Sequence, residues 1–67
     1  MNPQVGDIWE FHNEDINMHE APLLLVEQVD DPNYPTSIVF DGLYLESGTY
    51  GVFLFNKGNF EYWKKLA

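Results

Sequence analysis

The sequence lacks cysteine altogether, and it has no long apolar run. Disulfides therefore cannot stabilise the fold, and nothing in the composition indicates an oxidising compartment. The longest purely apolar run, Leu23 to Val26, is far shorter than the roughly 20 residues of a membrane-spanning helix. The N-terminal residues show no basic segment followed by an apolar one, as a signal peptide would. We therefore expect a soluble, cytoplasmic protein.

Cationic residues are scarce and confined to the C-terminal end of the chain. Lys57, Lys64 and Lys65 are the only ones, whereas every acidic residue except Glu61 lies within residues 1–56, and the net charge is −8. Nucleic-acid binding draws most of its affinity from Lys and Arg that replace counterions on phosphates. An acidic surface also repels anionic membranes. The sequence thus predicts that neither nucleic acid nor a membrane is a partner.

Aromatic residues, by contrast, are abundant: five Phe, four Tyr and two Trp. A chain of 67 residues cannot divide its apolar side chains between two cores, so residues 1–67 are expected to form one domain. Large side chains can replace disulfides as a source of stability in small domains, because each aromatic buries about 150–250 Å². The residues expected in the core are Trp9, Phe11, Phe40, Phe53 and Phe55. Replacing Trp9, Phe40 or Phe53 with alanine is expected to cost about 3–5 kcal/mol of stability.

Alternation of apolar and polar residues between turn signals predicts an all-β fold. The predicted strands are Ile8–Phe11, Leu23–Val29, Thr36–Glu46 and Thr49–Asn56. The predicted connections are a polar loop at His12–Glu20, a turn at Asp30–Pro35, a turn at Ser47–Gly48 with Gly48 at positive φ, and a turn at Lys57–Asn59. Pro22 is expected at the start of the second strand, and Gly42 is expected to mark a bulge or sharp bend.

The C-terminal segment "FEYWKKLA" fits two patterns. Phe60, Trp63 and Leu66 have helical spacing after a candidate N-cap at Asn59, while Phe60 and Tyr62 alternate as in a strand. We expect one turn of helix that runs into a short strand. With four or five short strands and glycines inside them, the pattern favours a small antiparallel barrel, because closure protects the edge strands.

Three short motifs resemble those of the small SH3-like β-barrel domains of bacteria and phages. They are Gly6-Asp7-Ile8-Trp9 at the first strand, the long second strand Leu23–Val29, and the turn Leu45-Glu46-Ser47-Gly48 before a short aromatic strand. The resemblance implies an SH3-like barrel of four to five antiparallel strands. Such domains include RNA-binding, methyl-lysine-reading and protein-docking members, and the fold does not select among them. The basic loops of the nucleic-acid-binding members are missing here.

Metal-capable side chains cluster in the predicted loop: His12, Glu14, Asp15, His19 and Glu20. Neither a His-Glu-x-x-His helix nor a calcium-binding Asp-x-Asp-x-Asp-Gly loop is present. The sequence therefore favours a solvated acidic loop over a metal site, and it indicates no cofactor.

No set of catalytic residues stands out. Glu10, Asp30 and Asp31 could pair as carboxylates, but Ser47 lies in a turn and no nucleophile accompanies a base. A domain of this size is also expected to have little room for a ligand pocket of several hundred Å³. The protein is therefore not expected to be an enzyme.

The remaining aromatics allow two interpretations. Tyr34, Tyr44, Tyr50, Tyr62, Trp9 and Trp63 could form a cage for a methylated ammonium near Asp41 and Glu46, or they could be core and ordinary surface residues. Tyr34 and Tyr50 lie beside turns and are expected to be exposed. The candidate interaction surface comprises Tyr34, Tyr44, Tyr50, Asp41 and Glu46.

The function that these observations favour is a small acidic protein-interaction module without catalytic activity, which docks a partner or a second copy of itself. The alternative is an acidic DNA mimic that inhibits a DNA-binding protein, its carboxylates standing in for phosphates. Alternation over Leu43–Phe55 also leaves some of Tyr44, Val52 and Leu54 outside a single core. This predicts a weak homo-oligomer that tightens with salt, unless the segment around Trp63 covers that patch.

Overall fold

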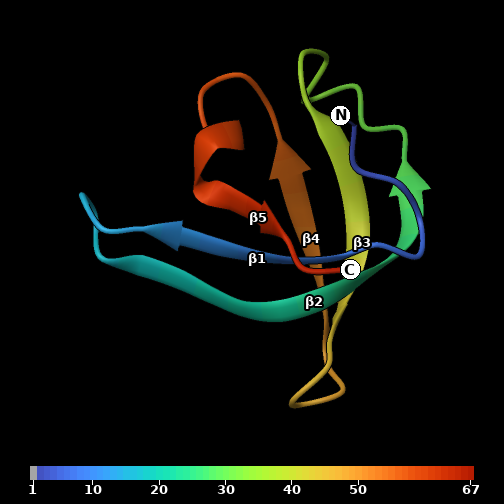
Figure 1. Ribbon diagram of the computed structural model, residues 1–67. Coiled ribbons are helices and arrows are strands. Elements are labelled where there is room, and N and C mark those ends of the chain that lie inside the picture. The colour runs from blue at the N-terminus through green and yellow to red at the C-terminus, as the bar shows by residue number, and fades with distance from the viewer. Residues whose placement is uncertain (1) are drawn as a thin grey trace.

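The computed structural model describes residues 2–67 as a single five-stranded antiparallel sheet (Figure 1). The elements are β1 (Ile8–Asn13), β2 (Met18–Val29), β3 (Ile38–Tyr44), β4 (Tyr50–Phe55), the 3-10 turn η1 (Phe60–Tyr62) and β5 (Trp63–Lys65). The strand order in the sheet is β4-β3-β2-β1-β5. The all-β prediction is confirmed, as is the prediction of a helical turn leading into a short strand. Within residues 2–67, no helical segment has the length and apolarity needed to cross a bilayer.

Strand β2 organises the fold because it belongs to two hairpins. Its 12 residues pair with β1 near the start of the strand and with β3 near its end. The strand curves between these two pairings, so the β3–β4 hairpin runs across the β1–β2 hairpin (Figure 1). The core cluster consists of Trp9, Phe11, Leu23, Leu25, Phe40, Phe53, Phe55 and Trp63. The prediction that aromatics dominate the core is therefore confirmed.

Pro22 lies inside β2 rather than at its start, so that prediction is wrong. The pairing of β1 with β2 passes from Trp9–Leu23 directly to Phe11–Glu20, which leaves one residue of β1 opposite Ala21 and Pro22. β2 therefore has one extra residue at this point, which makes a β-bulge. Proline lacks the N–H that a regular ladder needs, and a bulge is one of the few places inside a sheet that accept it.

A second bulge lies opposite Gly42 rather than at it. The pairing of β2 with β3 passes from Leu25–Gly42 to Glu27–Asp41, so Val26 is the extra residue, whereas Gly42 pairs regularly with Gly51 of β4. Both glycines make room for the ring of Phe53. A Cβ built on Gly42 would lie 2.8 Å from Phe53 Cδ2, and one on Gly51 would lie 2.9 Å from Phe53 Cζ. The bulge thus lies in β2, whereas Gly42 of β3 leaves room for the Phe53 ring in the core.

The predicted loop His12–Glu20 is mostly strand. β1 continues to Asn13 and β2 begins at Met18, so only residues 14–17 form the turn. Asn17 adopts a left-handed φ of 50°, and the Asn13 Oδ1 atom accepts a hydrogen bond of 3.1 Å from the Asp15 N–H. This end of the hairpin projects away from the rest of the molecule (Figure 1). The residues at this end are mostly polar and exposed, so no apolar alternation marks the strands, and this is why the sequence pattern missed them.

The sheet is open, with β4 and β5 as its two edges, so the closed barrel is not what residues 2–67 form. Side-chain hydrogen bonds link the two edges instead of a backbone ladder. The Leu54 carbonyl accepts bonds from Asn59 Nδ2 at 2.9 Å and from Trp63 Nε1 at 3.1 Å. The ring of Trp63 also stacks on Phe55, with centroids 4.3 Å apart. Asn59 precedes η1 but makes no side-chain capping bond, contrary to its predicted N-cap role.

Asp7 secures the turn that leads into β1. Its Oδ2 atom accepts hydrogen bonds from the Gln4 N–H at 2.9 Å and from Trp9 Nε1 at 3.2 Å, and Oδ1 lies 3.8 Å from Lys65 Nζ. The Gln4 bond is the main cause that lowers the pKa of Asp7 below 3.8, and Trp9 and Lys65 add to it against partial burial. A lowered carboxyl pKa stabilises the fold above the pKa of the unfolded chain. This contribution is lost as the pH falls through the folded-state value.

Candidate functional site

The surface of β2, β3 and β4 that faces away from the core carries the best candidate site. Paired residues in a ladder share a face, and alternate residues along a strand point to opposite faces. The side chains on the other side of the sheet from Phe40 and Phe53 therefore form three cross-strand rows. We call this side the outer face. The rows are Leu24–Leu43–Tyr50, Glu27–Asp41–Val52 and Val29–Val39–Leu54.

Several apolar side chains of this region are in contact with solvent. Tyr50 is 68 % exposed and Val52 is 59 % exposed, while the bulge residue Val26 beside them is 39 % exposed. The sequence predicts that some of Tyr44, Val52 and Leu54 lie outside the core, and this is confirmed for Val52. Val39 in the third row is by contrast only 2 % exposed, so the solvent-exposed apolar group consists of Tyr50, Val52 and Val26. Scattered exposed apolar residues are normal, but a contiguous group on one face is typical of an interaction site.

Two carboxylates lie in the middle row of the outer face. Glu27 of β2 and Asp41 of β3 are direct cross-strand partners, with Val52 next in the same row. Like charges placed directly opposite each other destabilise a sheet. In residues 2–67 the one ion pair joins Lys65 to Asp7, so neither acid of the middle row has a lysine within salt-bridge distance. The outer face therefore combines exposed apolar surface with an unneutralised acidic pair.

The structure brings together only part of the predicted interaction surface. Asp41 and Tyr50 lie on the outer face, and Glu46 is exposed in the turn between β3 and β4. Tyr34 is exposed as expected, but it lies in the loop before β3, at the other end of that strand (Figure 1). Tyr44 is on the opposite face of the sheet.

Tyr44 packs against the core instead of lying on the surface. Its ring meets Phe53 edge to face, with centroids 5.4 Å apart. The Tyr44 hydroxyl donates a hydrogen bond to the Glu20 carboxylate. Partial burial, followed by this bond and the charge of Glu20, raises the pKa of Tyr44 to about 12. Glu20, which the sequence suggested as a metal-capable loop residue, therefore anchors a tyrosine.

The raised pKa of Tyr44 predicts a specific alkaline titration. We expect the phenolate of Tyr44 to appear near pH 12 rather than near the ordinary value of 10. Its stabilising contribution is complete below pH 10 and disappears between pH 10 and about 12, because the unfolded chain loses this proton first. The difference in near-ultraviolet absorbance between wild type and Tyr44→Phe isolates this group. A midpoint at the ordinary value would contradict the bond to Glu20.

The six aromatics proposed for a cage are not assembled into one. Trp9 and Trp63 are buried in the core, where they serve packing. Tyr50 pairs with Leu43 near the end of β3, whereas Tyr34 precedes the start of that strand at Ile38, and at about 3.3 Å per residue this separates them by roughly 16 Å or more. The core interpretation is therefore the one that the structure supports for the tryptophans.

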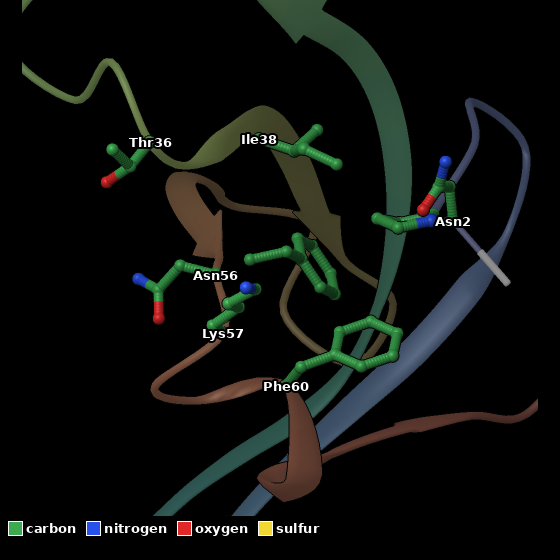
Figure 2. Close-up of a pocket in the computed structure, with 8 residues that line it drawn as sticks. Asn2, Thr36, Ile38, Asn56, Lys57 and Phe60 are labelled. Carbon is green, nitrogen blue, oxygen red and sulfur yellow. The ribbon is translucent and has the colours of Figure 1, made fainter.

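A pocket of about 330 Å³ lies at the end of the sheet beside η1 (Figure 2), contrary to the expectation that so small a domain has little room for one. It is lined by Asn2, Pro3, Thr36, Ile38, Phe55, Asn56, Lys57 and Phe60. The side chains of Ile38 and Phe60 lie on opposite sides of it in Figure 2. Sequence reasoning missed this pocket because its lining comes from three separate segments.

The pocket combines an apolar floor with amide and hydroxyl groups. Among residues 2–67, Lys57 is the one ionisable side chain in its lining, so no acid–base pair from this part of the chain faces the pocket. The pocket can accommodate an apolar group.

The two histidines of the predicted acidic loop are brought together. His12 and His19 are direct cross-strand partners in the β1–β2 hairpin. Among residues 2–67, no group of three or more His, Cys, Asp or Glu side chains is arranged to hold a metal ion.

Comparison of the chain with protein-family models, with curated proteins and with solved structures finds no match.

Proposed function

We propose that this protein is a non-catalytic docking module whose outer face binds a protein segment carrying Lys or Arg among apolar residues. The observation that carries this proposal is the acidic pair Glu27–Asp41 between apolar rows of the outer face. The partner's cation lies against the two carboxylates, and its apolar neighbours cover Tyr50 and Val52.

The energetics of the face support a cationic partner. Like charges directly opposite each other in a ladder are destabilising, so we expect the acidic pair to cost stability in the free protein. A cation removes that repulsion, and burial of the flanking apolar side chains lowers the local dielectric and strengthens the attraction. The net charge of −8 also attracts such a partner over longer distances.

We further propose that the open sheet is a variant of the SH3-like barrel. The strand order supports this, because it places β5 beside β1 after the short turn η1. The Gly6-Asp7 motif occupies the turn before β1, where Gly6 has a φ of 96°. Gly48 follows β3 with a φ of 72°, in the turn that the resemblance places there.

The salt dependence of binding distinguishes two possible partners of the outer face, a second copy of the chain and a cationic protein segment. A second copy brings another charge of −8, so a contact between copies should tighten as salt screens the repulsion. A cationic partner should bind less tightly as salt rises. We therefore expect weak self-association in sedimentation at about 0.5 M salt and less at about 0.05 M, with the opposite trend for partner binding.

The docking prediction is tested by removing charge from the outer face. We expect Glu27→Gln/Asp41→Asn to lose partners that wild type captures from a bacterial lysate at low salt. The same variant should be slightly more stable, by about 0.2–1 kcal/mol, because the repulsion is gone. The matched control is Glu14→Gln/Glu61→Gln, which changes the net charge equally at exposed positions away from the outer face. The measurements are capture at about 0.05 and 0.5 M salt and unfolding in urea.

The outcomes distinguish docking from DNA mimicry. Loss of capture in Glu27→Gln/Asp41→Asn alone supports the outer face. Equal weakening in both double variants, with DNA-binding proteins as the captured species, supports mimicry, because carboxylates that replace phosphates act over the whole surface. Unchanged capture in both would refute the role of the outer face.

A further inference from the structure

The β1–β2 hairpin holds two imidazole rings side by side in solvent. His12 and His19 are exposed, and their Nδ1 atoms lie 3.0 Å apart. Their ring centroids are 4.6 Å apart at an interplanar angle of 66°. They are the only two histidines of the chain.

Two ring nitrogens at this separation match the spacing of two neighbouring metal ligands. Imidazole nitrogens bind first-row divalent metals at about 2.0–2.1 Å, so 3.0 Å between them corresponds to an angle of about 90° at the metal. That angle suits square-planar or tetragonal coordination, which Cu²⁺ and Ni²⁺ adopt, better than the wider tetrahedral angle of Zn²⁺. Cu²⁺ also forms the strongest complexes of the divalent series.

We propose that His12 and His19 form a two-nitrogen chelate for Cu²⁺, and more weakly for Ni²⁺, across the ladder of the β1–β2 hairpin. Both Nδ1 atoms are ligands, and water completes the coordination. In the metal-free pair one ring donates its Nδ1 proton to the other Nδ1 atom. On binding, that proton moves to the Nε2 atom of the same ring, so a neutral pair releases no net proton.

The chelate connects the strands at the far end of the hairpin. The nitrogens come from residues directly opposite each other, so the metal ties the ladder together next to the turn formed by residues 14–17. A ligand that binds the folded state more tightly than the unfolded chain raises the melting temperature. Because the hairpin projects from the molecule, this stabilisation acts on a segment separate from the outer face (Figure 1).

The proposal is tested by titrating the full chain with Cu²⁺, Ni²⁺, Mg²⁺ and Ca²⁺. We expect one equivalent of Cu²⁺ to bind, with an electron paramagnetic resonance spectrum that shows coupling to two nitrogens. Removing one ring, by His12→Asn or His19→Asn, should weaken Cu²⁺ binding by roughly 10²-fold, because the second nitrogen otherwise binds intramolecularly. Saturating Cu²⁺ should raise the melting temperature of wild type by about 5 °C. Mg²⁺ and Ca²⁺, which prefer oxygen ligands, should have no effect.

The matched control is Glu14→Gln, which removes an acid from the same hairpin and leaves both rings in place. Its Cu²⁺ affinity should stay within about twofold of wild type, and comparison of all variants with wild type cancels metal held elsewhere on the chain. Both histidines are exposed, and circular dichroism verifies that each variant is folded. The chelate is refuted if the histidine variants bind Cu²⁺ as tightly as wild type. It is equally refuted if Glu14→Gln weakens binding as much as they do.

Discussion

Phe40→Ala should leave much of the protein unfolded at room temperature. Phe40 is 0 % exposed and meets Phe55 edge to face, with centroids 5.8 Å apart. Removing a buried phenyl ring costs about 3–5 kcal/mol, because both the transfer energy and the cavity oppose folding. A chain of 67 residues has a total stability of roughly 3–10 kcal/mol at the usual value per residue. The loss can therefore match the whole stability of the fold.

Urea unfolding followed by tryptophan fluorescence measures this effect. Phe40→Leu keeps most of the buried volume and should lose less than Phe40→Ala, which provides a folded variant if the alanine substitution is too severe. Tyr50→Ala is the exposed control, and it should change stability by no more than about 0.5 kcal/mol. Trp9 and Phe53, which are 3 % and 8 % exposed, should show losses of the same order as Phe40. A wild-type midpoint for Phe40→Ala would show that the core is assigned wrongly.

Gly42→Ala should destabilise the protein by about 1–3 kcal/mol, although alanine is ordinarily the better residue inside a strand. A Cβ at position 42 would lie 2.8 Å from Phe53 Cδ2 and 3.0 Å from Leu23 Cδ1. Both neighbours are buried, so neither can move without disturbing the packing around it. Gly51→Ala, whose Cβ would meet the same ring at 2.9 Å, should behave similarly.

A double-mutant cycle assigns this cost to the Phe53 ring. In a Phe53→Leu background, Gly42→Ala should reduce the free energy of unfolding much less, because the phenyl ring that the added Cβ would contact is absent. Gly58→Ala is the control, since its Cβ would approach the Asn56 side chain at 3.3 Å and not the Phe53 ring, so its effect should be the same in the wild-type and Phe53→Leu backgrounds. Additive effects of Gly42→Ala and Phe53→Leu would mean that the two sites do not interact.

The fold class could be predicted from the sequence because its signals are local. Alternation in Ile8–Phe11 and around Phe53 and Phe55 indicates strands whose aromatic side is buried. The turn at Ser47–Gly48 could also be predicted, because glycine is the residue that most readily adopts a positive φ. The structure gives Gly48 a φ of 72°. The pairing of His12–Asn13 with Met18–His19 could not be predicted, because these mostly polar residues give no periodic signal.

The candidate site was predictable only in part. Asp41 and Tyr50 lie on the same face of the sheet, whereas Tyr44, which the sequence analysis groups with them, packs against the core. Alternation separates Leu43 from Tyr44, yet it does not say which of the two points inward. That is decided by Phe53, which packs against Gly42, Gly51 and Tyr44 on the same side of the sheet.

The sequence by itself determined an all-β domain with an aromatic interior and a strongly acidic exterior, because hydrophobic patterning and net charge are properties of the chain alone. Only the tertiary structure decided which charged or titratable side chains meet. The bulge at Val26 sets the register that puts Glu27 opposite Asp41, and the β1–β2 register puts His12 opposite His19. A shift of one residue in either pairing would send these side chains to opposite faces. Register depends on how whole strands pair and on the turns and bulges that join or interrupt them, and the alternation within a single strand does not encode it.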